Sequence, residues 1–296
     1  MQTFYSPGKL LISGEYVVLS GSEALAIATK FGQKMIVKNS EQSDLIWNSF
    51  NHLNSEWFQA RYRAKNFEIV DSSNEDTASQ LKSILVKAFE LNPNWNVEAH
   101  KVETYLEFPL DWGLGSSSTL ICNIAKWAEV GAFELSQASF GGSGYDIAVG
   151  MVGSELIYSY PPAWEGFVWN PPFRKNLFFV HLNKKQNSRE SIASFEVDAV
   201  SEDDKQMFSA ITRRMVVCEE LKEFEHLINA HEEMLSGLLG RSKVKDLHFS
   251  DYPHAIKSLG AWGGDFVLAV GNEQSPEYFR NKGFDTILSF EEMVLT

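Results

Sequence analysis

The chain has 296 residues, of which 44% are hydrophobic and 13% aromatic, and its formal net charge at pH 7 is -13. This composition indicates a globular protein of one large or two ordinary domains and excludes a disordered chain. The acidic balance argues against binding to nucleic acid or an anionic membrane, and no apolar run is long enough to span a bilayer. Two cysteines, Cys122 and Cys218, give no disulfide framework or metal motif, so we expect a cytoplasmic protein.

Short apolar runs separated by turn residues open the chain. We expect strands at residues 10–13 and 16–19, with turns at Pro7-Gly8 and Ser20-Gly21. Lys9 and Glu15 lie among these strands. Taken alone, they are interpreted as solvent-facing strand residues.

The next elements alternate between strand and helix patterns. Polar and apolar residues alternate over residues 33–70, which predicts antiparallel strands with one wet face. Apolar residues at helical spacing then predict a helix over residues 81–89, which stops before Asn92-Pro93. Residues 97–108 are strand-like and lead into the stretch that is richest in chemical information.

That stretch, residues 109–128, reads PLDWGLGSSSTLICNIAKWA and joins a glycine- and serine-rich turn to an amphipathic helix. Gly113 and Gly115 permit a tight bend or a close approach of a ligand to the backbone. Ser116, Ser117 and Ser118 add hydroxyls beside the unpaired N–H groups of a helix start, which is a site for phosphate. The alternative is an ordinary turn followed by an ordinary N-cap.

A second glycine-rich turn follows in the segment FELSQASFGGSGYDIAV, residues 133–149. It presents Asp146 at the start of an apolar run, where the side chain would act either as a helix cap or as a catalytic acid. After it we expect a strand over residues 151–160 and a domain boundary in the Pro- and Trp-rich run at 161–173.

The second half opens with a strand at residues 176–182 and a polar loop. Lys184, Lys185 and Arg189 in that loop either supply positive charge for an acidic substrate or are simply solvated. A long helical stretch over residues 203–240 contains His-Glu-Glu, but Leu235 stands where the HExxH zinc motif needs its second His.

Three segments of this chain resemble the signatures of the GHMP kinases, the family named for galactokinase, homoserine, mevalonate and phosphomevalonate kinases. PGKLLISGEYVVL is similar to PGKxxxxGEHxVxxG, with Tyr16 in place of His, and PLDWGLGSSS is similar to PxxxGLGSS[AS]. KSLGAWGGDFVLAV, residues 257–270, resembles KxxGAGGGG, with Trp262 at a position that is usually glycine. The forms GEY, GSGYD and GGD favour the phosphomevalonate branch.

The resemblance implies an α+β fold in two domains, with ATP and acceptor meeting in a cleft. An N-terminal domain of the ribosomal-S5-like type would span residues 1–170, and a C-terminal ferredoxin-like domain would span residues 171–296.

The resemblance also implies a role for each matching residue. Asp146 would be the catalytic acid, and Lys9 would pair with it or stabilise charge on the γ-phosphate. ATP would be held by Gly113, Leu114, Gly115, Ser116, Ser117 and Ser118. Mg²⁺ would be bound by Ser116 or Ser117, and by Glu134 unless that residue is only an exposed acid at a helix end. The acceptor would contact Glu15, Ser143, Gly144, Tyr145, Ser188, Arg189, Gly263 and Gly264.

The function implied is an ATP-dependent kinase for a small acidic metabolite, phosphomevalonate ahead of mevalonate. Two alternatives are a sensor of the same fold that binds without turnover, and a diphosphomevalonate decarboxylase. We expect no nucleic-acid or membrane partner, and a monomer or homodimer.

Overall fold

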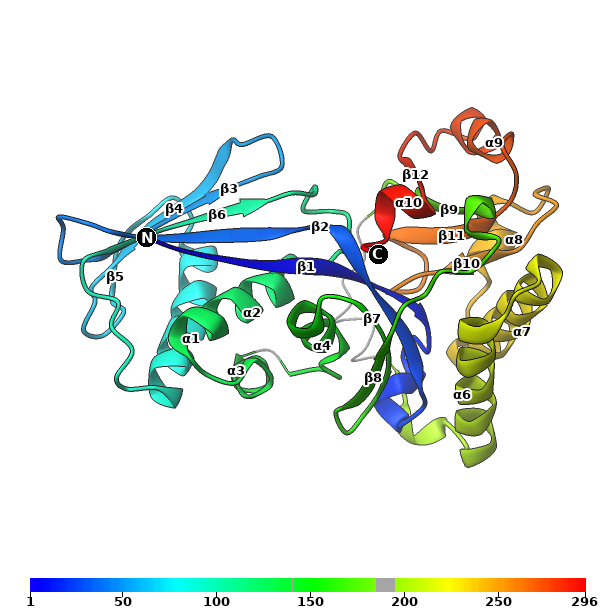
Figure 1. Cartoon of the computed structure of the whole chain (residues 1–296), viewed down its shortest axis with the longest axis horizontal. Helices are drawn as coiled ribbons and strands as arrows, with labels where there is room; N and C mark the ends of the chain where they lie inside the picture. Colours follow the sequence, from blue (N-terminus) through cyan, green and yellow to red (C-terminus); the bar gives the residue numbers. More distant parts are fainter. Residues whose placement is uncertain (140, 185–194) are drawn as a thin grey trace. The chain divides into compact units, whose positions relative to one another are not determined.

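The structure is a computed structural model that describes residues 1–139, 141–184 and 195–296 (Figure 1). It mixes helices and sheets, as the sequence predicts for an α+β protein. Its contacts divide the chain into two compact units that interleave along the sequence. The first unit comprises Met1–Gly8, Phe31–Leu110 and Leu114–Gly153, and the second comprises Lys9–Lys30, Asp111–Gly113 and Ser154–Thr296. The expected domains at 1–170 and 171–296 stay a prediction.

The first unit contains one end of two long strands and all of the elements that follow them up to residue 153. These elements are β1 (Gln2–Ser13), β2 (Ala24–Asn39), β3 (Leu45–Phe50), β4 (Glu56–Tyr62), β5 (Ile69–Ser72), α1 (Glu75–Leu91), β6 (His100–Leu106), α2 (Ser116–Ala128), α3 (Ala132–Ser139) and α4 (Tyr145–Val152). The strands β1 and β2 continue into the second unit.

The sheet of the first unit has the strand order β5-β4-β3-β6-β2. Its pairs are antiparallel, as the alternating pattern predicts, except that β3 and β6 are parallel. Pro7 lies inside β1, although a turn was predicted there, because β1 pairs only with β2 among the described strands and an edge strand tolerates a missing donor.

The core of the first unit lies between this sheet and its helices. Trp47 and Phe58 come from the sheet, while Leu85 and Ile124 come from α1 and α2, and all four side chains are buried in one cluster. Figure 1 shows α1, α2 and α3 on the same face of the sheet. This packing fixes α2, whose first turn carries the predicted phosphate site.

The second unit contains the remaining elements. They are η1 (Val17–Ser20), β7 (Glu155–Ser159), β8 (Ala163–Phe167), η2 (Arg174–Asn176), β9 (Leu177–His181), η3 (Val197–Ala199), α6 (Glu202–Val217), α7 (Leu221–Leu239), α8 (Val244–His248), β10 (Ile256–Ser258), β11 (Phe266–Val270), α9 (Ser275–Asn281), β12 (Ile287–Ser289) and α10 (Phe290–Met293). An antiparallel sheet of order β10-β11-β9-β12 forms its centre, and α7 packs against both α6 and β10.

Three predicted elements of the second unit need correction. Residues 16–19 form no strand. Tyr16 has a positive φ of 65°, and the 3-10 turn η1 that follows it ends at Ser20, before Gly21 with a φ of 100°. The strand expected at 151–160 is limited to β7, because α4 continues to Val152. The long helical stretch is two helices, because α6 ends at Val217 and α7 begins at Leu221.

A hairpin of a buried strand, β7, and an exposed strand, β8, completes the second unit. Ala24–Ala26 of β2 pair with β7, and β7 pairs with β8. The large sheet therefore continues from β2 to β7 and ends at β8. Most of β8 is exposed, including Trp164. Arg213 of α6 binds Glu165 on β8 at 3.2 Å and Glu23 at 2.6 Å.

Candidate functional site

The glycine–serine loop opens α2 with unpaired backbone donors. Gly113 and Gly115 have φ values of 66° and 88°, in the left-handed region that glycine adopts without strain. Gly115 is the N-cap of α2, and no side chain of the described residues caps the helix. The first N–H groups of α2 therefore lack the partner that a capping side chain usually provides, and together with the helix dipole they favour an anion.

The three serines after Gly115 are not equivalent. Ser118 is buried, and its hydroxyl donates to the carbonyl oxygen of Gly115 at 2.9 Å. Ser117 is exposed and Ser116 is half-buried, and neither hydroxyl has a hydrogen-bond partner among the described residues. Among the described residues, the structure thus leaves Ser116 and Ser117, two of the three predicted metal ligands, with free hydroxyl oxygen atoms.

The first half of the loop is anchored in the second unit. Lys9 donates through Nζ to the carbonyl oxygen of Gly113 at 2.9 Å. A Cβ atom at Gly113 would overlap the carboxyl group of Asp265, so that acid lies directly against the loop backbone. The Trp112 ring meets Phe266 edge-on, with centroids 5.5 Å apart. A lysine and a carboxylate from two different signatures therefore meet at one glycine.

Asp146 lies in the first turn of α4, in the first unit. Like α2, α4 follows a left-handed glycine, Gly144 with φ 81°, and has no capping side chain from residues 1–139, 141–184 or 195–296. The half-buried Asp146 carboxylate accepts a hydrogen bond from the Ile147 N–H at 3.0 Å. Burial and the nearby Asp146 charge raise the pKa of the Cys122 thiol to about 12, so Cys122 is a neutral core residue.

Glu15 forms a buried ion pair. Its side chain is 3% exposed, and Lys257, which is fully buried, donates to its Oε1 at 2.8 Å. Lys257 also lies 3.1 Å from Glu232 on α7. The carboxyl group that was predicted to contact the acceptor instead joins the first signature to the third, and its substrate role stays a prediction.

The protonation of this cluster follows from its burial. Burial raises the pKa of Glu15 to about 7 against the opposing effect of Lys257, and burial also raises the pKa of Glu232. Burial and the Lys257 charge hold the pKa of His231 well below its usual range. Neutral His231 accepts the Gly14 N–H at 3.0 Å through Nε2, so its 3.6 Å approach to Glu15 is not an ion pair.

Tyr16 and Trp262, the two residues that depart from the signature patterns, contact each other. The Tyr16 hydroxyl accepts a hydrogen bond from the Trp262 backbone N–H at 2.9 Å. The indole is 5% exposed and donates to the Ser242 carbonyl oxygen. Trp262 is thus a core residue of the second unit.

The other predicted site residues differ in what surrounds them. Ser143 and Gly144 are buried and Tyr145 is half-buried at the start of α4, while Gly263 and Gly264 lie in the turn before β11. Glu134 is exposed in the first turn of α3, next to Gly131. Ser188 and Arg189, with Lys185, lie outside the described residues.

No grouping of three or more His, Cys, Asp or Glu side chains suited to a metal ion occurs in the described ranges. A Mg²⁺ site here would rely on hydroxyl oxygens and on the phosphates of its nucleotide. The free hydroxyls of Ser116 and Ser117 suit that chemistry. None of the helices within the described ranges combines the length and the apolar character needed to cross a bilayer.

Three residues that matter to the site were not assigned a role from sequence. Lys257 and Asp265 fall inside the third signature, and the position of each, beside glycines and a buried strand, was the available signal. His231 was set aside with the failed zinc motif. Nothing local to it indicates a partner 217 residues away, at Gly14.

Comparison with known proteins supports the fold. No family model matches the sequence, and no curated protein matches it. Solved structures do match. The Methanococcus jannaschii mevalonate kinase has a TM-score of 0.72 and 17% identity, and the match covers 97% of this chain and 96% of that one.

Two further structures extend the comparison. The Streptococcus pneumoniae phosphomevalonate kinase in complex with phosphomevalonate and AMPPNP has a TM-score of 0.70 and 15% identity, covering 98% of this chain and 100% of that one. The Lactococcus lactis galactokinase complexed with galactose has a TM-score of 0.63 and 14% identity, covering 95% and 88%. The chain therefore has the fold of the GHMP kinases. The matches include kinases for mevalonate, phosphomevalonate and galactose.

Proposed function

We propose that this protein is an ATP-dependent kinase that transfers the γ-phosphate of ATP to phosphomevalonate or mevalonate. The observation that carries the proposal is the start of α2, where left-handed Gly113 and Gly115 precede a helix that no side chain in the described ranges caps. Lys9 adds a positive charge at the same loop. This is an arrangement for binding phosphate groups, on a fold shared with known kinases.

The residues of the loop would bind the nucleotide in distinct ways. The N–H groups of residues 116–118 would donate to phosphate oxygens, and the hydroxyl of Ser116 or Ser117 would bind Mg²⁺. When bound, Mg·ATP supplies the phosphoryl group and partly neutralises its charge. Phosphoryl transfer needs mainly positioning and charge stabilisation, which these groups and Lys9 would supply.

Asp146 would act on the acceptor. If the acceptor is a hydroxyl, as in mevalonate, the carboxylate would orient it and take its proton. If the acceptor is a phosphate, as in phosphomevalonate, no base is needed and Asp146 acts by electrostatics. The forms GEY, GSGYD and GGD favour phosphomevalonate, and the acceptor would lie near Ser143, Gly144, Tyr145, Gly263 and Gly264. We further propose a cytoplasmic monomer or homodimer.

The test measures ADP release from Mg·ATP with mevalonate and phosphomevalonate supplied separately. We expect turnover with one of them. Asp146→Asn should slow it by about 10² to 10⁴ if Asp146 is a general base. Asp76→Asn is the matched control, because Asp76 also lies in the first turn of a helix of the first unit.

Each outcome of this test has a clear meaning. Full turnover by Asp146→Asn would overturn the role of that residue. Tight ATP binding without ADP release for either acceptor would favour the non-catalytic sensor of the same fold. Release of CO₂ from diphosphomevalonate would favour the decarboxylase.

A further inference from the structure

The helix α2, which carries the proposed phosphate site, has polar residues on its buried side. Thr119 is 1% exposed and Asn123 is 0% exposed, among apolar neighbours such as Ile121 and Ile124. The two polar residues lie four positions apart and therefore share one face of the helix. Burying a polar group costs free energy unless the group is hydrogen-bonded, so the partners of these two side chains indicate what they do.

Both side chains bind to strand β2 of the same unit. The Thr119 hydroxyl lies 3.0 Å from Oε1 of Gln33, and the Asn123 side-chain amide donates to the carbonyl oxygen of Gln33 at 2.9 Å. The Asn123 side-chain oxygen accepts the hydroxyl of Ser6, on β1, at 3.0 Å. Gln33 is itself only 7% exposed. One residue of β2 thus contacts two successive turns of α2.

The same face of α2 is also bound to β1, which lies beside the helix in Figure 1. Lys126 donates through Nζ to the Ser6 hydroxyl at 3.0 Å and to the Tyr5 carbonyl oxygen at 2.7 Å. Apolar packing is non-directional and would let a helix rotate or slide on a sheet, whereas hydrogen bonds are directional. These bonds therefore fix the rotation of α2 and its position along the strands.

The Thr119 hydroxyl reaches the first turn of the helix as well. It lies 3.0 Å from the carbonyl oxygen of Ser116, the same distance as from Gln33 Oε1. A hydroxyl has one hydrogen, so the two acceptors share it in a three-centre arrangement. A chain of contacts therefore runs from Gln33 through Thr119 to Ser116, one of the two serines proposed to bind Mg²⁺.

A phosphate site at a helix start cannot be held by an ordinary cap. A capping side chain accepts a hydrogen bond from one of the first N–H groups of the helix, and these are the groups that a phosphate needs. The N-cap of α2 is Gly115, which has no side chain. Thr119 instead binds a carbonyl oxygen of the first turn. It can thus order the turn from inside the protein and leave the N–H groups to the ligand.

We propose that Gln33 and Thr119 are positioning residues for the nucleotide. Gln33 holds the Thr119 hydroxyl, and Thr119 holds the first turn of α2 in the geometry that binds Mg·ATP. The inference rests on the proposed kinase function, and it assigns a role to two residues that lie outside the three signature segments.

The first test is Thr119→Val, which removes the hydroxyl and keeps the shape and β-branching of the side chain. We expect the Kd for Mg·ATP, measured by calorimetric titration, to rise about three- to tenfold, because the ligand must then order the first turn itself. Thr119→Ser keeps the hydroxyl and should bind within about twofold of the wild type. An unchanged Kd in Thr119→Val would overturn the proposal.

Thr104→Val is the matched control for a loss of stability alone. Thr104 lies on β6 of the same unit, is 2% exposed, and donates to the Ser49 hydroxyl at 2.9 Å. We expect Thr104→Val to lower the free energy of unfolding about as much as Thr119→Val does, and to change the Kd for Mg·ATP by less than about twofold. Equal weakening of Mg·ATP binding by the two variants would overturn the proposal.

A double-mutant cycle tests the action of Gln33 through Thr119. Gln33→Met removes the side-chain acceptor and keeps the backbone carbonyl oxygen that binds Asn123. If Gln33 acts through Thr119, the variant Gln33→Met, Thr119→Val should have a Kd for Mg·ATP close to that of the weaker-binding single variant. A Kd that rises by the product of the two single effects would show that Gln33 does not act through Thr119.

These titrations need neither an acceptor nor turnover, so they separate the inference from the proposed function. Mg·ATP binding that depends on Thr119, in a protein that releases no ADP, would support the inference and overturn the kinase. ADP release by a protein whose Kd and KM for Mg·ATP are the same in Thr119→Val would support the kinase and overturn the inference. A wild type that binds no Mg·ATP would overturn both.

Discussion

The glycine–serine loop and the buried Glu15–Lys257 cluster both come from signature segments, yet their polar groups are used in opposite ways. Within the part of the chain that the structure describes, the loop leaves the start of α2 without a capping side chain and the Ser116 and Ser117 hydroxyls without a partner. The cluster pairs Glu15, Lys257 and Glu232 with one another at 3% exposure or less. Residues of the signature segments thus divide into those whose polar groups stay unpaired among the described residues and those whose polar groups hold the fold together, and the motif alone does not distinguish them.

The largest effect should come from removing the cation of the cluster. Lys257→Met leaves two buried carboxylates without a partner, and we expect the free energy of unfolding to fall by about 3–5 kcal/mol. Urea denaturation measures it. The triple variant Lys257→Met, Glu15→Gln, Glu232→Gln should recover much of the loss. If it is no more stable than Lys257→Met, unpaired charge is not the cause.

The next effect concerns pH. Burial raises the pKa of Glu15 to about 7 from its ordinary 4.5, so between these values the folded state holds a proton that the unfolded state releases. The contribution of Glu15 to stability is therefore present below about pH 4.5, falls as the pH rises to about 7, and is flat above that.

Glu15→Gln tests this linkage, because glutamine mimics the protonated acid at every pH. From pH 4.5 to pH 8, the unfolding free energy of Glu15→Gln relative to the wild type should rise by a few kcal/mol. Denaturation at four pH values in that range measures the difference. Parallel curves for the two proteins would show that Glu15 does not hold the proton.

Gly113→Ala probes the contact between the loop and Asp265. A side chain there needs φ 66° and would overlap the Asp265 carboxyl group, whereas Gly283, with φ 88°, has no atom near the corresponding position. Backbone strain at a positive φ destabilises both alanine variants. Gly113→Ala should lose about 1–3 kcal/mol more stability than Gly283→Ala, and should bind ATP more weakly. Equal losses would mean that Asp265 moves away freely.

The smallest expected effect separates the three serines. Ser118→Ala removes a buried hydrogen bond and should cost about 1 kcal/mol of stability. Ser116→Ala and Ser117→Ala should stay within about 0.5 kcal/mol of the wild type. One of these two should instead weaken Mg·ATP binding, measured by calorimetry with and without Mg²⁺. If Ser118→Ala alone weakened binding, the division between ligand-facing and fold-holding serines would be wrong.

Local chemistry predicted the local parts of the molecule. Glycine positions and apolar spacing predicted the helix that starts at Ser116, the turn before Asp146 and most of the strands. The 3-10 turn after Tyr16 was not predicted. Tyr16 has a positive φ of 65° and accepts a hydrogen bond from Trp262, which is 246 residues away in the sequence.

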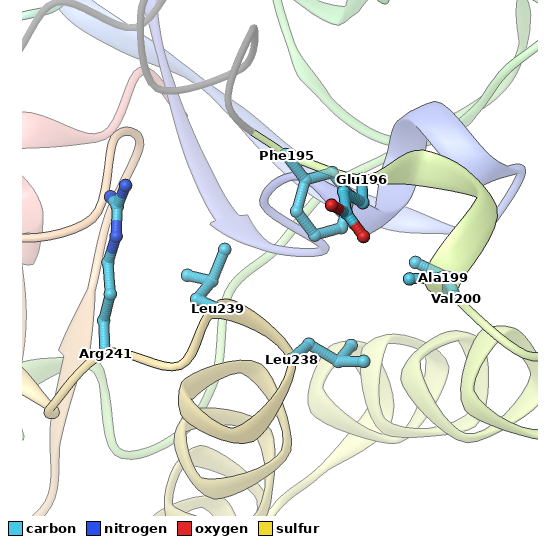
Figure 2. Close-up of a pocket in the computed structure, with 7 residues that line it drawn as sticks. All are labelled: Phe195, Glu196, Ala199, Val200, Leu238, Leu239 and Arg241. Atoms are coloured by element: carbon cyan, nitrogen blue, oxygen red, sulfur yellow. The ribbon is translucent and has the colours of Figure 1, made fainter.

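The same reason explains what was missed in the candidate site. Lys257 and Glu15 are 242 residues apart, and nothing in either segment indicates the other. The pocket in Figure 2 is lined by Phe195, Glu196, Ala199, Val200, Leu238, Leu239 and Arg241, which come from two segments without a motif. Contacts between segments that are distant in the sequence determine these features, and a local sequence pattern does not predict such contacts.

The salt bridges of Arg213 have a consequence for solubility. The strand β8 ends its sheet with most of its residues exposed, and a strand of this kind invites pairing with another chain. Arg213, held to Glu165 and Glu23, places charge along that edge. Charge beside an edge strand disfavours its pairing with a strand of another chain, so we expect this triad to oppose edge-to-edge aggregation of the folded protein.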